Sequence, residues 1–213
     1  MEPATRRLSL ALLGLAAVIV AGVAGCGNEA PPTPPVLNST GKDAGIVRGG
    51  TASDALFIAG LNTLTVSSSA FAANGEIPSA HTRYGDDRSP PLAWSGAPAG
   101  TKSFAIIVDD PDAPRVWVHW IAWNIPAGTT NLAAGVAADD PTLRQGANDY
   151  GGAGGLGYGG PQPPSGTHHY RFHLVALSSM LDLSAGANES ALLGAMRGKV
   201  LAWGMLVGTC RAP

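Results

Sequence analysis

The sequence is poor in charge and in cysteine. Of its 213 residues only 13% are charged, the formal net charge is -2, and the cysteines are Cys26 and Cys210. A net charge this close to zero provides no broad basic surface, so no nucleic-acid partner is expected. Two cysteines form at most one disulfide, which excludes a small domain held together by several disulfides. Any partner must therefore be recognised by a local site.

Aromatic residues are also few, whereas glycine and proline are abundant. The chain has 6% aromatic residues, 29 glycines and 17 prolines, and 45% of its residues are hydrophobic. That hydrophobic fraction excludes a fully disordered chain. Many turns favour short strands over a bundle of long helices. The length suits one well-buried domain with a tail.

The N-terminal region has the order of a secretory signal. Arg6 and Arg7 precede the apolar stretch Leu8–Val20, and Val23-Ala24-Gly25-Cys26 follows. This pattern predicts a signal peptide over residues 1–25. A cysteine directly after small residues resembles the bacterial lipobox, which implies that Cys26 is diacylated and becomes the first residue after cleavage.

Two alternatives concern this anchor. An uncleaved transmembrane helix is the first, but the apolar stretch is shorter than the ~20 residues that span a bilayer. The second concerns export, because Thr5-Arg6-Arg7-Leu8 also resembles a twin-arginine signal, so the general secretory and twin-arginine routes both stay open. In either case the expected location is the cell membrane, with a lipid anchor and the domain facing outside the cytoplasm. Cys210 is then expected as a single buried thiol.

A tether is predicted between the anchor and the folded domain. Residues 26–54 show no apolar periodicity and contain Pro31, Pro32, Pro34 and Pro35. Proline-rich segments of this kind act as stiff spacers. The folded domain is therefore predicted over residues 55–213, without an internal repeat.

The domain is expected to be mostly β. Phe104–Val108 is apolar on both faces, as in a central strand. Asn188–Arg197 is the only segment with convincing helical periodicity, and Gly198 is its expected stop. The further strands are predicted over Leu61–Val66, Trp117–Trp123, His169–Leu177 and Val200–Val207.

Three carboxylates follow the expected central strand. Asp109, Asp110 and Asp112 lie within four residues and repel one another unless a cation, backbone amides or another donor compensates them. Aspartate and proline favour turns, so a simple turn is one interpretation. The other is a rigid rim that directs one carboxylate into a cleft.

The strand over Trp117–Trp123 contains a single histidine. A period of two places His119 on one face with Trp117, Ile121 and Trp123. A histidine on such a face is either a buried structural residue or part of a binding site.

The strand that follows Gly166 is rich in histidine. A period of two places His168 and Tyr170 on one face, where an imidazole and a phenol can together bind a small ligand. The same period places His169, Arg171 and His173 on the other face, which is expected to be solvated.

The segment Asn148–Gly166 is rich in glycine. Gly155, Gly157 and Gly160 fit G-x-G-x-x-G, but prolines follow them instead of a helix, so this is not a dinucleotide fingerprint. Such a loop can bring backbone N–H groups close to an anion, and a plain flexible loop is the alternative.

Taken together, these motifs resemble the phosphatidylethanolamine-binding protein family, and most of all its bacterial YbhB/YbcL or Raf-kinase-inhibitor-like branch. The resemblance covers roughly residues 70–211, and its motifs occur in the family's order. They are Ser89-Pro90-Pro91-Leu92-Ala93-Trp94, Asp110-Pro111-Asp112-Ala113-Pro114, Val118-His119-Trp120, Asn124-Ile125-Pro126, Asn148-Asp149-Tyr150-Gly151, Gly157-Tyr158-Gly159-Gly160-Pro161, Pro163-Pro164, His168 with Tyr170, Val200-Leu201-Ala202 and Gly208-Thr209.

The resemblance implies a β-sandwich-like fold around a large central sheet, with a few short peripheral helices and a small anion pocket at one end. It implies that the pocket is formed by Asp110, His119, His168 and Tyr170. Asp112, Pro114 and the glycine-rich loop, including Gly159, are implied at its rim. Two departures from the family concern this region: Gln162 stands where many relatives have cysteine, and His169 where many have arginine, a fixed bidentate donor.

The expected function is that of a lipid-anchored, non-catalytic binding protein. Its ligand would be a small anionic or phosphorylated group such as a phospholipid head group, and inhibition of a protease or kinase is a further role that the family suggests. A hydrolase is the alternative, but no G-x-S-x-G or H-E-x-x-H motif occurs. A metal site formed by Asp110, His119 and His168 is another alternative. No cofactor is expected.

Overall fold

The computed structural model describes residues 64–152 and 155–213. The predicted signal peptide, Cys26, the tether and the start of the predicted domain lie outside the described residues. Within the described ranges, no helix is both long and apolar enough to cross a membrane.

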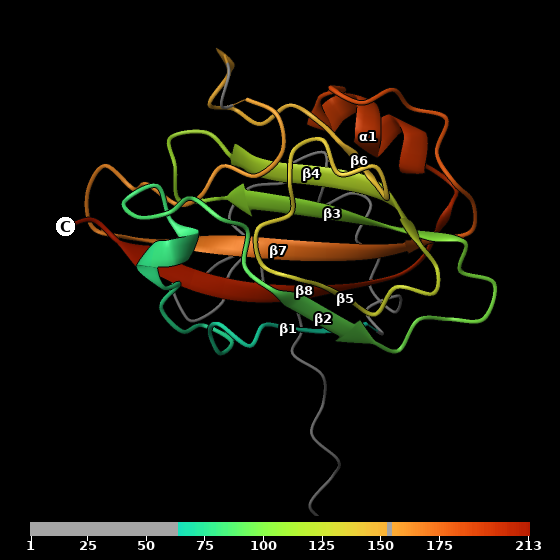
Figure 1. Cartoon of the computed structure of the whole chain (residues 1–213), viewed down its shortest axis with the longest axis horizontal. Coiled ribbons are helices and arrows are strands. Elements are labelled where there is room, and N and C mark those ends of the chain that lie inside the picture. The colour runs from blue at the N-terminus through green and yellow to red at the C-terminus, as the bar shows by residue number, and fades with distance from the viewer. Residues whose placement is uncertain (1–63, 153–154) are drawn as a thin grey trace, which may run out of the picture. The chain divides into compact units, whose positions relative to one another are not determined.

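The described strands form two antiparallel sheets (Figure 1). The larger sheet has the strand order β6-β4-β3-β7-β8, and the smaller sheet has the order β1-β2-β5. The larger sheet consists of β3 (Ser103–Asp110), β4 (Trp117–Pro126), β6 (Arg144–Gln145), β7 (Thr167–Leu177) and β8 (Val200–Arg211). The smaller sheet consists of β1 (Thr65–Ser67), β2 (Leu92–Ser95) and β5 (Asn131–Leu132). The predicted β-sandwich with a large central sheet is therefore confirmed.

Strand β3 lies in the middle of the larger sheet and is buried along its whole length. Ile106 and Val108 pack into the core that also contains Trp94 of the smaller sheet. Ala105 and Ile107 pack into a second core on the opposite face. The strand is thus apolar on both faces because both faces are covered, as its sequence predicts.

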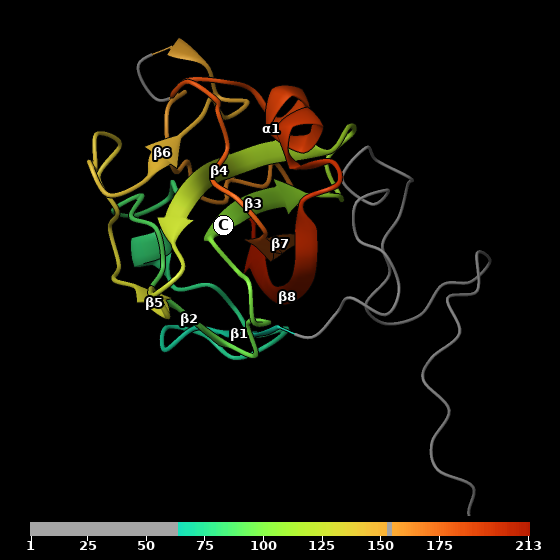
Figure 2. The same ribbon diagram turned by 90° about the vertical axis from the view of Figure 1, so that its right-hand side faces the viewer.

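A short helix covers the second core. Helix α1 (Glu189–Met196) buries Leu192, Leu193 and Met196. Figure 2 shows α1 and the smaller sheet on opposite sides of the larger sheet. The side chain of Asn188 caps the helix by accepting a hydrogen bond from the Ala191 amide at 3.0 Å. Gly198 follows the helix with φ of 71°, so the predicted helix and its stop are confirmed.

Strand β4 runs further than predicted, through Asn124-Ile125 to Pro126. A shift of register between Phe104 and Ile106 of β3 accommodates the extra residue, and Asn124 adopts φ of 59°, which asparagine tolerates. The Asn124 side chain then bonds both the amide and the carbonyl of Leu181, at 2.8 and 2.9 Å. Strand β8 also continues beyond Val207, to Arg211. Of the strand predicted over 61–66, Thr65 and Val66 belong to β1, and residues 61–63 lie outside the described residues.

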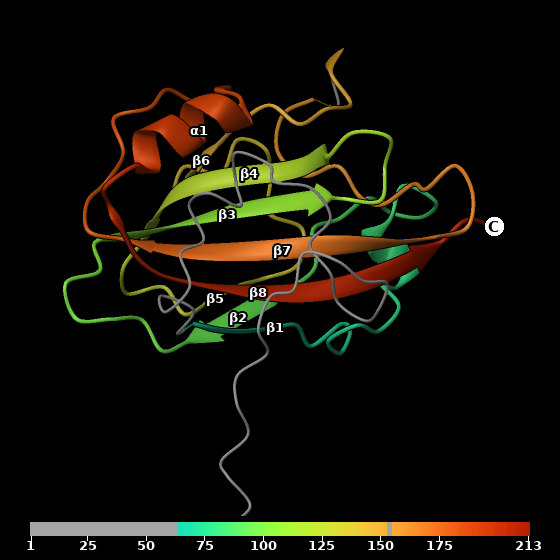
Figure 3. The same cartoon turned by 180° about the vertical axis from the view of Figure 1, so that it is seen from behind.

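Strands β7 and β8 run side by side along the molecule (Figure 3). A further short helix is the 3-10 helix η2 (Ser79–His81). At one end of the larger sheet, β3 ends at Asp110 while β4 begins at Trp117 and β7 begins at Thr167. Polar residues that are distant in the sequence therefore meet at this end.

Candidate functional site

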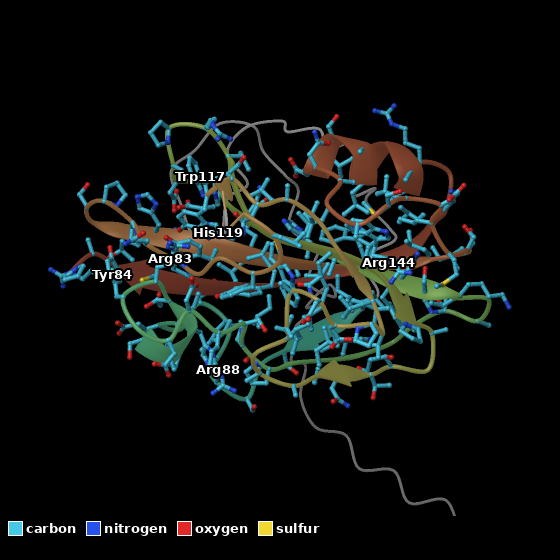
Figure 4. All side chains as sticks on the ribbon, turned by 45° about the horizontal axis from the view of Figure 1, so that its top comes forward. Arg83, Tyr84, Arg88, Trp117, His119 and Arg144 are labelled. Carbon is cyan, nitrogen blue, oxygen red and sulfur yellow. The ribbon has the colours of Figure 1, made fainter. Side chains whose placement is uncertain are left out.

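A cavity of about 370 Å³ lies at this end of the larger sheet. The predicted residues Asp110, Pro114, His119, His168 and Tyr170 all line it. In Figure 4, Trp117 and His119 lie at one end of the domain with Arg83 and Tyr84, far from Arg144. The wall is completed by Ala113, Trp117, Tyr150, Gln162, Pro163 and Pro164.

Two of the residues implied at the rim do not line the cavity. The Asp112 carboxylate accepts hydrogen bonds from the amide and the Nδ1 of His169, at 2.8 and 2.7 Å. Burial would raise the pKa of Asp112, but these bonds to His169 outweigh it and lower the pKa. Gly159 acts through its backbone, because its carbonyl accepts a hydrogen bond from His119. Both residues therefore support the site from outside its wall.

His119 reaches the cavity because strand β4 bulges at this residue. Val108 of β3 pairs with Trp120 and Asp109 pairs with Val118, so His119 is the extra residue between them. The predicted face shared by His119, Ile121 and Trp123 is therefore wrong. Ile121 and Trp123 pack in the second core, whereas the His119 ring lies 5.1 Å from the Tyr170 ring.

The structure fixes the neutral tautomer of His119. Its Nδ1 lies 2.6 Å from the carbonyl oxygen of Gly159, and a carbonyl can only accept, so the proton is on Nδ1. Burial lowers the pKa of His119, while the Gly159 carbonyl and the charges of Asp110 and Asp109 act in the opposite direction. Because Nδ1 is bonded to Gly159, Nε2 is the ring nitrogen that a ligand can contact.

His168 is held in the same way by Asp110. The His168 Nδ1 lies 2.7 Å from Asp110 Oδ2, and the exposed fractions of the two side chains are 13% and 5%. The other oxygen of Asp110 accepts from the amides of Asp112 and Ala113, at 2.8 and 3.2 Å. The sequence allowed two interpretations of this segment, a simple turn or a carboxylate directed into a cleft. In the structure Asp110 does both. Asp110 orients one imidazole and closes its own turn.

The hydroxyl of Tyr170 is buried within the site. Tyr170 lines the cavity and has no exposed surface. Among the described residues, none forms a hydrogen bond with this hydroxyl. Burial and the nearby charge of Asp110 raise the pKa of Tyr170, so the phenol keeps its proton and can donate it. A buried polar group without a partner indicates a place where a ligand or water binds.

Aromatic rings and two arginines form the outer part of the site. Tyr150 packs against Trp117 and His119, with ring centroids 5.6 Å apart in both cases. The Arg83 guanidinium lies 4.1 Å from the centre of the Tyr150 ring, and that of Arg115 lies 4.8 Å from the Trp117 ring. These are cation–π distances. Sequence reasoning missed Arg83 because no motif connects it to the distant Tyr150.

The opposite face of β7 is buried, so its prediction as a solvated face is wrong for Arg171 and His173. Arg171 donates two hydrogen bonds to Asp109, at 2.6 and 2.8 Å. The side chains of Asp109, Arg171 and His173 are almost completely buried. His173 Nε2 lies 3.6 Å from Asp109. Burial would raise the pKa of Asp109, but His173 and Arg171 outweigh it and lower the pKa. Only His169 of this set is exposed, as predicted.

Three amides of the glycine-rich loop are bonded within the protein. The amide of Gly159 donates to the His119 carbonyl at 2.8 Å, and that of Gly157 donates to the Gly146 carbonyl at 3.1 Å. The amide of Gly160 donates to Asp87 at 2.6 Å. Because these donors have partners within the protein, they are not available to an anion. The glycines instead permit close packing, since a Cβ at Gly159 would lie 2.6 Å from the Tyr150 ring.

Within the described ranges, no group of three or more histidine, cysteine, aspartate or glutamate side chains has the arrangement of a metal site. Cys210 is buried as a free thiol, and burial raises its pKa to about 11. This result agrees with the single buried thiol that the sequence predicts.

The fold and the site define a class of protein: a two-sheet β domain with a small cavity of histidines, tyrosines and one carboxylate at the end of its larger sheet. A sequence profile described as "Phosphatidylethanolamine-binding protein" matches residues 67–211. The chain therefore belongs to the phosphatidylethanolamine-binding protein family.

Individual relatives agree with this assignment. The chain is 48% identical over 144 residues to a UPF0098 protein of Methanothermobacter thermautotrophicus, which covers 67% of this chain and 95% of the relative. It is 36% identical over 214 residues to a Mycobacterium tuberculosis protein named "Putative lipoprotein LppC", with 98% of both chains covered. It is 31% identical to the crystal structure of YbcL from E. coli, described as a member of the mammalian PEBP family, with a TM-score of 0.65 and coverage of 71% of this chain and 99% of that one.

Proposed function

We propose that this protein is an exported, lipid-anchored binding protein whose cavity takes a small anionic group, such as phosphate or a phospholipid head group. The observation that carries the proposal is the buried Tyr170 hydroxyl, which lines the cavity and has no partner among the described residues. His119 and His168 line the same cavity, and the Nδ1 atom of each ring is bonded within the protein, so Nε2 is the nitrogen that each ring can offer to a ligand. Three polar atoms from two strands can thus converge on one ligand.

Binding without catalysis is supported by the composition of the wall. The described residues that line the cavity include no serine, threonine, cysteine or lysine that could act as a nucleophile. Asp110 is occupied by His168 and by two backbone amides. Its role in the proposal is to orient the imidazole, and it can also accept from the ammonium group of a zwitterionic head group.

The membrane anchor is supported by the sequence and by one relative. Cys26 follows small residues after the apolar stretch Leu8–Val20. The relative named as a lipoprotein aligns over almost the whole chain. The proposal therefore keeps a signal over residues 1–25, a lipidated Cys26 with a tether over 26–54, and the binding domain over 55–213, outside the cytoplasm. A further part of the proposal is that the exported protein inhibits a protein target, such as a protease, and that ligand binding in the cavity regulates this inhibition.

The test is calorimetric titration of the full-length chain with inorganic phosphate and with phosphoethanolamine. We expect saturable binding that His119→Ala abolishes or weakens at least tenfold. His169→Ala is the matched control, because His169 is 53% exposed and bonds Asp112 outside the cavity wall. Equal effects of the two substitutions would contradict the assignment of the site. A parallel titration with Zn²⁺ tests the metal alternative, and saturable Zn²⁺ binding lost in His119→Ala would favour it.

A further inference from the structure

We infer that the cavity binds its oxyanion together with one proton, so that it selects an oxyacid group able to carry a proton, such as a phosphoryl group, over a group that cannot, such as sulfate. This inference rests on the proposed function and specifies its ligand class. The evidence is the tautomer of His119, the same arrangement at His168 and the charges around the cavity.

The tautomer of His119 makes it an acceptor toward the cavity. Its Nδ1 proton is used by the Gly159 carbonyl at 2.6 Å. The Nε2 of a neutral imidazole then carries a lone pair, which repels the lone pairs of a deprotonated oxygen. A contact between this Nε2 and an oxyanion therefore needs a proton between the two atoms. The strand bulge and the packing against Tyr150 and Tyr170 hold the ring, so it cannot simply turn to present Nδ1.

His168 shows the same arrangement. Its Nδ1 lies 2.7 Å from Asp110 Oδ2, and the carboxylate of Asp110 already accepts from two amides. In its neutral form His168 also offers a lone pair at Nε2. The Tyr170 hydroxyl is then a buried donor without a partner among the described residues, and the Trp117 indole and the Gln162 amide are further donors in the wall. When neutral, the two imidazoles both accept at Nε2, which suits a ligand that brings a donor.

The charges around His119 point in the same direction. Asp109 and Asp110 lie on β3, Tyr170 and His168 on β7, and Tyr150 in the loop after β6. The part of the wall formed by residues 64–152 and 155–213 contains one carboxylate and no arginine or lysine. Arg83 and Arg115 lie on the Tyr150 and Trp117 rings, and Arg115 is paired with Asp149 at 2.9 Å. A dianion would therefore face Asp110 without a fixed cation in the wall, and a proton reduces that repulsion.

The proton balance is simple, and no bond between heavy atoms forms or breaks. A phosphoryl dianion and one proton from solvent enter the site together. The proton sits on the ligand oxygen and is donated to His119 Nε2, or it sits on Nε2 and is donated to the ligand. Phosphoryl groups have a second pKa of about 6, so they reach the monoanion near neutral pH. Sulfate carries no proton in this range, so its contact with His119 depends on protonation of the imidazole.

The experiment is calorimetry of the full-length chain at pH 8 in two buffers with different ionisation enthalpies, with inorganic phosphate as the probe. The difference in heat gives the number of protons taken up, and we expect close to one. The Kd should rise with pH between pH 7 and pH 8.5, and the slope should approach tenfold per pH unit as the free phosphate becomes the dianion. At pH 7 sulfate should bind at least about tenfold more weakly than phosphate.

Two variants locate the proton. His119→Gln replaces the titrating nitrogen by an amide that can donate at any pH, so proton uptake should fall toward zero and the preference for phosphate over sulfate should be lost. His169→Gln lies outside the wall and should keep both. Full proton uptake in His119→Gln would overturn the inference, because another group would then carry the proton.

The outcomes separate this inference from the proposed function. If phosphate binds without proton uptake, and as tightly as sulfate, the inference is overturned while the anion site stands. If neither phosphate nor sulfate binds at any pH from 5 to 8.5, the proposed anion site fails, and the inference fails with it.

Discussion

Asp109 and Asp110 are consecutive residues with very different surroundings. The Asp109 carboxylate has no exposed surface and accepts two hydrogen bonds from Arg171. The Asp110 carboxylate lies on the opposite face of β3, bonds His168 and borders the cavity. Alternation along the strand thus separates a buried ion pair from a candidate binding site by a single residue.

Strand β7 shows the same division on its two faces. Arg171 and His173 lie beside Asp109, whereas His168 and Tyr170 line the cavity. Both faces carry an Asp–His contact, although the sequence predicts a binding role only for the face with His168 and Tyr170. The difference lies in the remaining hydrogen-bonding capacity, since Tyr170 has no partner among the described residues. Unused capacity that faces a cavity, more than charge itself, distinguishes the site that can bind a ligand.

The first prediction addresses the buried ion pair. Asp109→Asn should destabilise the protein by about 3–5 kcal/mol, because it removes the carboxylate charge beside a buried guanidinium. Urea denaturation measures this change. Asp110→Asn is the matched substitution one residue away and should cost only about 1–2 kcal/mol, because its carboxylate borders the cavity. Similar losses for the two substitutions would show that the two carboxylates do not have different roles.

The second prediction addresses the cavity face of β7. Tyr170→Phe should weaken phosphate binding by about 1.5–3 kcal/mol, which is roughly ten- to a hundredfold, because a hydrogen bond to a charged ligand is lost. The free energy of unfolding should stay the same or rise by about 1 kcal/mol, since a buried hydroxyl without a protein partner is removed. Titration calorimetry and urea denaturation on one preparation measure both quantities. A variant that loses stability together with binding would mean that the hydroxyl has a structural role.

The third prediction addresses the support of the cavity wall. Gly159→Ala would place a Cβ 2.6 Å from the Tyr150 ring. Overpacking of this kind costs about 1–3 kcal/mol and should also move the ring, which weakens binding. The near-ultraviolet circular dichroism of the aromatic residues should change with it.

Gly194→Ala is the control for this substitution. Gly194 lies in α1, and a Cβ there would meet nothing within 4 Å. Alanine should therefore stabilise the helix by up to about 1 kcal/mol and leave binding unchanged. A loss of binding in both variants would mean that the effect of Gly159→Ala is not local.

The fold could be predicted largely from the sequence because its signals are local. Three predicted features each depend on a few neighbouring residues. They are the strand over Phe104–Val108 with two apolar faces, the helix after Asn188 and its stop at Gly198. The facing of His168 and Tyr170 follows from the regular period of β7. The motifs of the family then predicted the β-sandwich around a large central sheet.

The errors arose where a distant partner or an irregularity decides. The bulge at His119 depends on how β3 pairs with β4, which a period of two cannot show. The burial of Arg171 depends on Asp109 in another strand. Tyr150 belongs to a recognised motif, but its place in the wall depends on loop packing, and Arg83 had no signal at all. Contacts between residues distant in the sequence therefore decide the facing and burial of these side chains, which local periodicity cannot predict.

The last prediction concerns stability against pH and has the smallest effect near neutrality. Burial lowers the pKa of His119 below its ordinary value of 6.5. Below pH 6.5 the unfolded chain binds a proton at this residue that the folded protein excludes, so the contribution of His119 to stability is present above 6.5 and is lost as pH falls. The slope from this one group is at most about 1.4 kcal/mol per pH unit. In urea denaturation between pH 5 and pH 7, His119→Gln should reduce the slope. If saturating phosphate also flattens the slope of the unsubstituted protein, the ligand brings the proton that the empty site excludes; an unchanged slope in His119→Gln would instead show that His119 is already charged in the folded protein.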